Sequence, residues 1–468
     1  MSLTHRVSLA RELVSTFGRH CKCPWHAGAA TRLQHQHDTT DANTDYAFEF
    51  VSSTLRYGPG VTAEIGQDLS SLGAKRIMVL TDPNLVQLAP VRRVLDSLTR
   101  ASLAYDVYSQ VRVEPNVDSF QDAIVSARRQ PYDAFVAVGG GSSMDTAKTA
   151  AIFKANPDAQ LEDYEGLPYG RNLTPKNPML PLICVPTTAG TGSETTAVAV
   201  FDRPERHAKV AIRNRRLKPM LGLVDPHNLV TMPRHVTIYS GFDVLCHALE
   251  SFTNIPYWQR PPRPTHPAER PVYQGSNPIS DVWARQALRI IAAYFRRAVQ
   301  DPEDFEARSQ MLMASSFAGM GFGNAGVHLC HGLSYALASL IKKFTSPDYN
   351  SDHPMLPHGL SVVLTSPAVF EFTGPACPER HLEAALLLGA DPKTSRKEDA
   401  GRILADILRG FMSDFRVPNG IQAVGFGRSD IPALTASSYP TMQATKIPPR
   451  SQTQEQIAQI YENSLKSY

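Results

Sequence analysis

The stretch Asp133-Ala-Phe-Val-Ala-Val-Gly-Gly-Gly-Ser-Ser-Met-Asp-Thr-Ala-Lys148 decides the fold. Residues 133–138 form a short apolar run typical of a buried strand, and three glycines follow it directly. A helix that begins at Ser142 or Ser143 would turn its free N–H groups and positive dipole end toward those glycines. The pattern predicts a strand, a turn and a helix that can hold a pyrophosphate. Tight packing alone can also explain such a turn, and the spacing is neither G-x-G-x-x-G nor a Walker loop.

The same alternation of strands and helices runs from about Tyr57 to residue 234. Helical periods, such as residues 117–129, separate strand-like runs at residues 76–81, 104–109, 180–185, 208–212 and 221–225. Alternation of this kind predicts a parallel sheet covered by helices. Ligands of such sheets bind beyond the carboxyl ends of the strands. Asp82 follows one strand there, and Pro186-Thr-Thr-Ala-Gly-Thr-Gly-Ser-Glu194, rich in hydroxyls, follows another.

The second half of the chain has a different pattern. From His235 onward long helical periods replace the strand signal, at residues 282–295, 305–320, 329–341 and 400–408. A chain of 468 residues also exceeds the size at which one core keeps growing. We therefore expect an α/β nucleotide-binding domain over residues 41–234 and an all-α domain over residues 235–468.

Composition excludes several classes of protein. A net charge of +3 is no footprint of nucleic-acid binding, and no run of 18 apolar residues predicts a membrane span. The six cysteines have no C-x-x-C spacing, so neither a zinc ribbon nor a disulfide framework is indicated. We expect small-molecule substrates, no nucleic acid and no membrane, and the sequence leaves a homo-oligomer open.

The N-terminus has a composition of its own. The first 37 residues hold five arginine or lysine residues and one acid, Glu12, with apolar residues on one helical face. This composition predicts a mitochondrial transit peptide over residues 1–40, with a disordered basic tail as the alternative.

A candidate cation site lies in the predicted helix Gly241-Phe-Asp-Val-Leu-Cys-His-Ala-Leu-Glu250. Asp243 and His247 are four residues apart, so both side chains project from one face and can share a divalent cation. Alone, the pair is equally typical of an ordinary helix surface. Further histidines stand at His328, His331 and His358.

Five motifs together resemble the iron-containing alcohol dehydrogenases. They are Thr81-Asp-Pro-Asn84, Gly139-Gly-Gly-Ser-Ser-Met-Asp145, Pro186-Thr-Thr-Ala-Gly-Thr-Gly-Ser-Glu194, Asp243-x-x-x-His247 and Pro357-His-Gly359, in the order seen in that family. The resemblance covers about residues 50–425. It implies an N-terminal domain that binds NAD, a helical domain that binds a metal, and an active site in the cleft between them.

The resemblance also implies roles for individual residues. Asp82 would meet the adenosine ribose hydroxyls and favour NAD over NADP, and Asn116 would line the cofactor cleft. The pyrophosphate would be held by Gly140, Gly141, Ser142 and Ser143, and the ribose and nicotinamide would be flanked by Thr187, Thr188 and Lys209.

The metal ligands follow from the same resemblance. In the family, the third metal ligand is a histidine that is followed by a glycine and a bulky apolar residue. In this sequence His331 fits that pattern. The implied set is Asp243, His247, His331 and His358, and one carboxylate with three imidazoles suits Fe(II) or Zn(II). His328 and His353 are then expected to be ordinary core or surface histidines.

Two features depart from the family pattern. Tyr335, the candidate catalytic residue, stands where many members carry a second histidine, and a phenol with an ordinary pKa of about 10 is a poor base near neutrality. This favours hydride exchange between two substrates bound in turn over alcohol oxidation that releases a proton. The second feature is a segment rich in proline and arginine at residues 255–278, which predicts an extended surface loop. One of its arginines, Arg260, Arg263 or Arg270, could receive a substrate carboxylate.

The leader and the insertion favour, within the resemblance, a mitochondrial matrix enzyme with tightly bound NAD. That would imply hydride transfer from a hydroxy acid, 4-hydroxybutyrate, to a 2-oxo acid, 2-oxoglutarate, giving succinate semialdehyde and 2-hydroxyglutarate. The alternatives are an alcohol dehydrogenase with exchangeable NAD, a lyase resembling dehydroquinate synthase, and a non-catalytic protein that binds NAD and metal.

Overall fold

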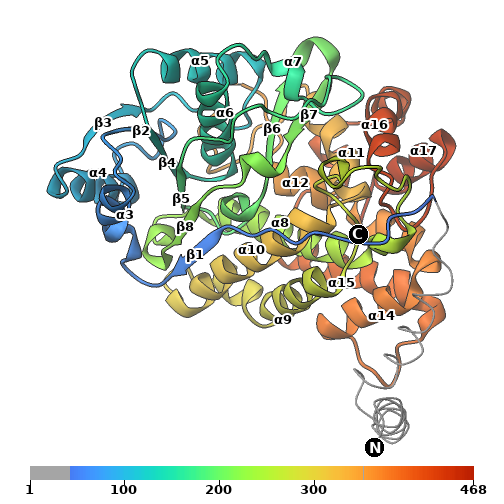
Figure 1. Ribbon diagram of the computed structural model, residues 1–468. Coiled ribbons are helices and arrows are strands. Elements are labelled where there is room, and N and C mark those ends of the chain that lie inside the picture. The colour runs from blue at the N-terminus through green and yellow to red at the C-terminus, as the bar shows by residue number, and fades with distance from the viewer. Residues whose placement is uncertain (1–42, 352) are drawn as a thin grey trace, which may run out of the picture.

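The computed structural model describes residues 43–351 and 353–468 (Figure 1), so the predicted transit peptide lies outside the described residues. Six parallel strands form the main sheet in the order β1-β8-β5-β4-β2-β3. Their bounds are β1 (Thr54–Tyr57), β2 (Arg76–Leu80), β3 (Ala104–Tyr108), β4 (Ala134–Gly139), β5 (Leu182–Pro186) and β8 (Leu221–Val224). The predicted parallel sheet is confirmed.

Alternate residues of the central strands explain how the helices cover the sheet. Ile77 and Val79 of β2 pack against α3 (Ile65–Ser71) and α4 (Ala89–Arg100). Met78 and Leu80 of the same strand pack on the other face, against α5 (Val117–Arg128) and α6 (Gly141–Ala155). Because successive side chains of a strand point to opposite faces, one apolar run serves both layers.

The strand order brings the predicted polar loops to one edge. Strand β2 lies between β3 and β4, so the direction of winding reverses between β2 and β4. Leu80 pairs with Ala137 in β4, and Gly139 pairs with Pro186 in β5. The loops after β2, β4 and β5 therefore leave the sheet side by side.

The predicted strand at residues 208–212 does not join the main sheet, which corrects that expectation. It forms β7 (Ala208–Arg213) and pairs antiparallel with β6 (Val198–Arg203) in a separate hairpin. The connection, a 3₁₀ turn at Pro204–Arg206 followed by His207, is too short for the crossover that a parallel partner needs. The hairpin packs against α11 (Leu329–Ser339) of the helical half.

Beyond β8 the described chain contains helices and loops but no named strand. The α-helices are α8 (Arg234–Thr253), α9 (Pro278–Gln300), α10 (Phe305–Ala325), α11, α12 (His358–Val363), α13 (Ser366–Thr373), α14 (Pro378–Leu387), α15 (Ala400–Asp414), α16 (Ile431–Thr445) and α17 (Gln454–Asn463). Helix α8 lies at the centre, packed against α9, α10 and α12, with its residues buried from Gly241 to Thr253. The predicted all-α second half is thus confirmed.

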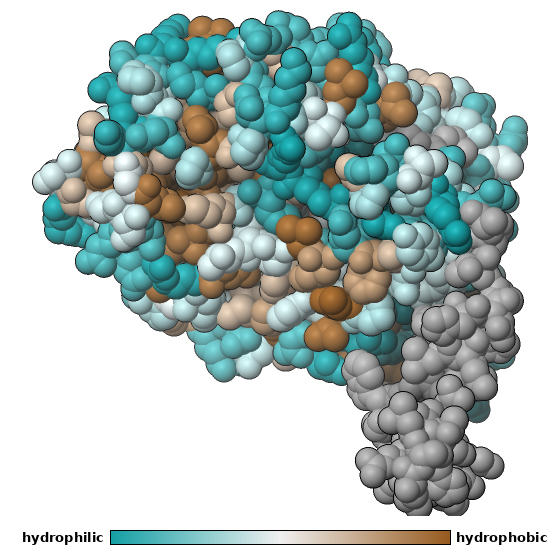
Figure 2. Space-filling view, in the orientation of Figure 1, coloured by the Kyte–Doolittle hydropathy of each residue, from teal (hydrophilic) through white to brown (hydrophobic). Residues whose placement is uncertain are grey.

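None of the described helices combines the length and apolarity needed to cross a bilayer. The upper part of the surface in Figure 2, over α5 and the short helix α7 (Leu161–Tyr164), is mostly hydrophilic.

Residues 43–51 cross onto the helical half rather than packing with the sheet that follows them (Figure 1). Asp45 forms an ion pair with Arg270, and the backbone N–H of Val51 donates to the side chain of Asn324 in α10. Residues 43–51 therefore pack on the helical half, although the sequence assigns them to the α/β domain.

Candidate active site

One cavity of about 440 Å³ gathers the predicted site residues from both halves. Its lining includes Asp82, Gly140, Gly141, Ser142, Ser143, Thr187, Thr188, Lys209, Asp243, His247, His331, Tyr335 and His358. These residues are separated by up to 276 positions, yet they face a common space.

The glycine turn after β4 forms one end of this cavity. Helix α6 starts at Gly141, one residue before the earlier of the two predicted starts, and the residues of its first turn that carry free N–H groups line the cavity. A Cβ atom at Gly141 would lie 2.7 Å from the side chain of Thr191, so only glycine leaves this approach open. The buried Ser143 hydroxyl has no hydrogen-bond partner in the described structure. Free donors and a helix N-terminus suit a pyrophosphate, so the residues present fit the nucleotide that the sequence predicts.

Asp82 follows β2 on the same edge and is almost fully buried. Burial raises the pKa of its carboxyl, although the backbone N–H of Asn84 donates to it over 2.8 Å and opposes that shift. A buried acceptor at this position can bind vicinal ribose hydroxyls and repel a 2′-phosphate.

Asn116 is the one predicted cofactor residue that does not line the cavity. Its side chain accepts a hydrogen bond from the N–H of Ser119 and caps α5. The preceding residues Glu114 and Pro115 line the cavity instead. An asparagine directly before a helix is a strong N-cap, and this local role competes with ligand binding.

The four predicted metal ligands meet at the other end of the cavity. One ligand atom from each of Asp243, His247, His331 and His358 lies within 4.8 Å of the others. The Asp243 Oδ1 atom lies 3.6 Å from His247 Nε2, 3.4 Å from His331 Nε2 and 3.6 Å from His358 Nε2. Three helices, α8, α11 and α12, supply these side chains.

Close packing of α12 on α8 brings His358 to this cluster. A Cβ atom at Gly359 would lie 1.9 Å from the carbonyl oxygen of Tyr239, so the glycine of the Pro-His-Gly motif permits the contact. Asp243 and His247 share one face of α8, as their spacing predicts.

The geometry fits a small divalent cation. Tetrahedral ligands about 2.1 Å from a cation lie about 3.4 Å from one another, which is close to the measured separations. Asp243 Oδ1 and His331 Nε2 are buried and have no hydrogen-bond partner in the described structure. Buried polar atoms rarely lack a partner, so a cation would satisfy both.

Glu250, which the sequence analysis did not single out, supports this cluster from behind. Its carboxylate contacts Nδ1 of His331 and accepts hydrogen bonds from the N–H groups of His328 and Cys330, at 3.1 and 2.6 Å. Burial alone would raise the pKa of this carboxyl, but the imidazoles of His328 and His331 hold it at about 2. A carboxylate that holds the far nitrogen of an imidazole directs the near nitrogen toward a metal. Glu250 lies one turn beyond His247 on the same helix, and this spacing was the available signal.

Burial and neighbouring charges shift the pKa values of the ligand imidazoles in different directions. Burial lowers the pKa of His247 to about 3, and its ring stacks on Phe322 with centroids 3.9 Å apart. Burial would also lower the pKa of His331, but Glu250 and Asp243 raise it well above its usual range. Two carboxylates therefore attract positive charge to this cluster, which a bound cation would supply.

The histidines that were expected to be ordinary have their own partners. His328 caps α11, where its Nδ1 accepts from the N–H of Leu329, and its Nε2 lies 2.9 Å from the hydroxyl of Thr253. His353 lies 3.1 Å from the hydroxyl of Ser351. Neither belongs to the four-residue cluster.

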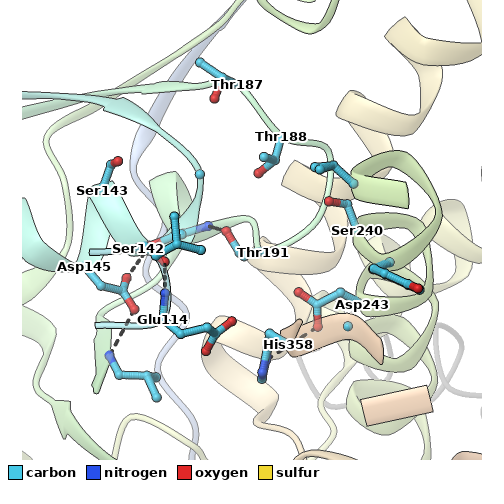
Figure 3. Close-up of a pocket in the computed structure, with 18 of the residues that line it drawn as sticks. Glu114, Ser142, Ser143, Asp145, Thr187, Thr188, Thr191, Ser240, Asp243 and His358 are labelled. Carbon is cyan, nitrogen blue, oxygen red and sulfur yellow. Dashed lines mark hydrogen bonds and ion pairs between the residues drawn. The ribbon is translucent and has the colours of Figure 1, made fainter. Parts of the chain in front are cut away.

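Glu114, also missed from sequence, connects the two ends of the cavity. Figure 3 shows its side chain extending from Ser142 toward His358. Its N–H donates to the Ser142 hydroxyl over 3.1 Å, and its carboxylate contacts Lys209. Burial alone would raise the pKa of this carboxyl, but Lys209 and His358 lower it. Its φ of 52° is uncommon for a residue with a side chain, and such backbone strain gathers at functional sites.

Tyr335 lines the cavity one turn after His331 on α11. Helix α11 packs against β7, which carries Lys209. Burial alone would lower the pKa of the Lys209 ammonium, but Asp202 and Glu114 raise it. Tyr335 therefore lines the same cavity as the four predicted metal ligands.

The arginines of the insertion line neither the main cavity nor the small cavity of about 20 Å³ beside it, so the hypothesis that one of them receives a substrate carboxylate there is wrong. Residues 43–46 occupy two of them, since Arg270 pairs with Asp45 and the Arg263 guanidinium donates to the carbonyl of Thr44. Arg260 is buried away from the cavity lining. The segment is extended as predicted, with short 3₁₀ turns at Tyr257–Gln259 and Pro267–Glu269, and it contributes Tyr273 to the cavity.

Comparison with known families gives two matches that together span most of the chain. Residues 52–226 match the family described as "Iron-containing alcohol dehydrogenase", and residues 265–465 match "Fe-containing alcohol dehydrogenase family, C-terminal".

Curated relatives match over almost their whole length. The chain is 53% identical to the mitochondrial hydroxyacid-oxoacid transhydrogenase of Xenopus laevis over 448 residues, which cover 96% of each protein. It is 54% identical to the protein of the same name in Caenorhabditis briggsae, covering 98% of this chain and 99% of the relative.

Solved structures match more distantly. A 1,3-propanediol oxidoreductase superposes with a TM-score of 0.77 at 27% identity, covering 89% of this chain and all of the other. An alcohol dehydrogenase from Oenococcus oeni also gives a TM-score of 0.77, at 28% identity over 90% of this chain and all of the other.

Proposed function

Because the chain belongs to the iron-containing alcohol dehydrogenase family, we propose that it is a mitochondrial hydroxyacid-oxoacid transhydrogenase. It is an oxidoreductase that acts on CH–OH groups and uses NAD and a divalent metal. Identity above 50% over nearly the full length of relatives with that name supports the assignment. The arginine-bearing first 40 residues agree with a mitochondrial location.

We propose 4-hydroxybutyrate as the hydride donor and 2-oxoglutarate as the acceptor, with NAD retained between the two half-reactions. The overall exchange balances without an external oxidant, since the two hydrogens lost by the hydroxy acid are gained by the oxo acid. The cavity carries the hydride-transfer part of this proposal, because it holds a nucleotide cradle at one end and a cation cluster at the other. The identity above 50% to relatives named transhydrogenases supports the exchange between two acids.

Each end has its own residues. The turn at residues 139–143, Asp82, Thr187, Thr188 and Lys209 would hold NAD, which supplies the hydride carrier. Asp243, His247, His331 and His358 would hold Fe(II) or Zn(II), which supplies a Lewis acid for the substrate oxygen.

The protein side chains then have three tasks. Glu250 orients His331, and Phe322 covers the ring of His247 and keeps water from it. The Tyr335 hydroxyl relays the hydroxyl proton away from the hydroxy acid in the first half-reaction and a proton to the oxo acid in the second, so no net proton is released. Glu114 keeps Lys209 in place between the two ends.

Purified protein with measured metal and NAD contents tests the proposal. With both substrates and no added NAD, we expect succinate semialdehyde and 2-hydroxyglutarate to form in equal amounts over many turnovers. A requirement for stoichiometric added NAD would contradict a transhydrogenase and would instead support the second candidate, an alcohol dehydrogenase with exchangeable cofactor. The nucleotide cradle and cation cluster alone would serve that enzyme equally well.

A further inference from the structure

Arg213 occupies the last position of β7, the strand that also carries Lys209. Lys209 lines the main cavity, whereas Arg213 lines the small cavity beside it. The two residues are four apart on one strand, so their side chains point to the same face about 13 Å apart. That strand packs against α11, which carries His331 and Tyr335. Arg213 therefore lies along the wall that faces the metal ligand and the proposed proton donor.

Arg213 lines a small cavity of about 20 Å³ that lies beside the main one and shares lining residues with it. Tyr273, His331 and Tyr335 line both this cavity and the main one. The volume is that of roughly one water position, which also suits one oxygen of a carboxylate.

Arg213 has no counter-ion in the described structure. Its guanidinium carbon lies 5.6 Å from the centroid of the Tyr273 ring, and its Nε is buried without a hydrogen-bond partner. Lys209, by contrast, forms ion pairs with Glu114 and Asp202. A buried donor on a cation is costly to leave unpaired, and the planar fork of an arginine matches a carboxylate.

We propose that Arg213 binds one carboxylate of each substrate and so selects carboxylic acids as the substrate class. This inference rests on the proposed function. In 4-hydroxybutyrate the carboxyl carbon lies three carbon–carbon bonds from the carbon that loses hydride. In 2-oxoglutarate the distal carboxyl carbon lies three such bonds from the keto carbon. One fixed receptor therefore serves both half-reactions, with each reacting oxygen at the cation cluster.

The role of the insertion changes accordingly. Its arginines bind residues 43–46, whereas its Tyr273 covers one side of Arg213 and lines the substrate end of the cavity. A ring against a guanidinium holds the cation and leaves its N–H edge available.

Matched substrates test this assignment in Arg213→Ala, with Arg213→Lys as the conservative variant and Arg263→Ala as the control outside the cavity. Donor selectivity is the ratio of kcat/KM for 4-hydroxybutyrate to kcat/KM for 1-butanol. Acceptor selectivity is the same ratio for 2-oxoglutarate and 2-oxopentanoate, which lacks the distal carboxylate. Because each ratio is taken on one preparation, the folded fraction cancels.

We expect Arg213→Ala to lower both ratios about 10- to 100-fold, Arg213→Lys to restore part of the loss, and Arg263→Ala to leave both unchanged. Calorimetric binding of glutarate, a non-reacting dicarboxylate, should weaken about tenfold or more in Arg213→Ala alone. If wild-type protein exchanges hydride between the two acids but Arg213→Ala keeps both ratios, the Arg213 assignment is overturned and the proposed function stands. If wild-type protein does not exchange hydride between them, the proposed function fails, and this inference fails with it.

Discussion

The cofactor end of the cavity is built from backbone and small hydroxyl side chains, whereas the cation end is built from large side chains on three helices. Asp82, the glycine turn and Thr187 each follow directly after a strand of one sheet, so local motifs create that end. The cation end needs α8, α11 and α12 to pack together before any ligand set exists. The two ends should therefore fail independently when single residues are changed.

The largest effect should come from Asp243→Ala. Asp243 Oδ1 is the atom around which the three imidazoles gather, so we expect cation loss and a decrease in hydride exchange on the order of a thousandfold. Metal analysis and exchange rates measure this, with the exposed Asp158→Ala as control. The NAD content should stay unchanged, and its loss together with the metal would show that the two ends are not separable.

Tyr335 tests how the proton is handled. Tyr335→Phe removes a hydroxyl from a side chain that lines the cavity, and we expect exchange to fall about a hundredfold while metal and NAD contents persist. Tyr335→His should increase oxidation of 4-hydroxybutyrate with free NAD, because an imidazole can pass the proton to solvent. Rates with and without added NAD measure both effects, and an unchanged Tyr335→Phe rate would exclude the hydroxyl from the chemistry.

Glu250 allows the orientation of a metal ligand to be tested apart from metal ligation itself, because it contacts His331 but does not belong to the four-residue cluster. Glu250→Gln keeps the shape of the side chain but removes the charge that faces His331. We expect metal affinity to weaken about 10- to 100-fold, measured by competition with a chelator. Excess metal should restore exchange. Unaltered affinity would mean that Glu250 merely fills space between α8 and α11.

Asp82 gives the smallest expected effect and concerns the other end. Asp82→Ala removes the buried acceptor after β2, so we expect about tenfold weaker NAD retention and better use of NADP. Metal content should not change. NAD and NADP titrations on metal-loaded protein measure the shift, and an equal loss of metal would contradict the independence of the two ends.

The same contrast explains what could be predicted from sequence. Gly140, Gly141 and Ser143 follow a buried strand, so chain order alone brings them to the ligand. The spacing of Asp243 and His247 predicted that both side chains lie on one face of α8. The choice of His331 over His328 depended on the family resemblance. Nothing local relates Glu114 to His358 or Arg213 to Tyr273, because tertiary packing creates those contacts.

Besides the placement of Asn116, two predictions went wrong for identifiable physical reasons. The strand at residues 208–212 had the right local pattern, but a short connection to β6 required an antiparallel hairpin. The arginines of the insertion had the right chemistry for a carboxylate, but Asp45 and the carbonyl of Thr44 take two of them. Both errors concern partners that lie outside the segment itself.

The most direct measurement uses 4-hydroxybutyrate in which both hydrogens at C4 are deuterium. The labelled donor is mixed with 2-oxoglutarate and protein of known NAD content, without added NAD, and the 2-hydroxyglutarate is analysed by mass spectrometry. We predict one deuterium at C2 in nearly every product molecule over many turnovers, because hydride passes between the two substrates inside one cavity. Unlabelled 2-hydroxyglutarate, or product limited to one equivalent of the bound NAD, would contradict hydride exchange at this site.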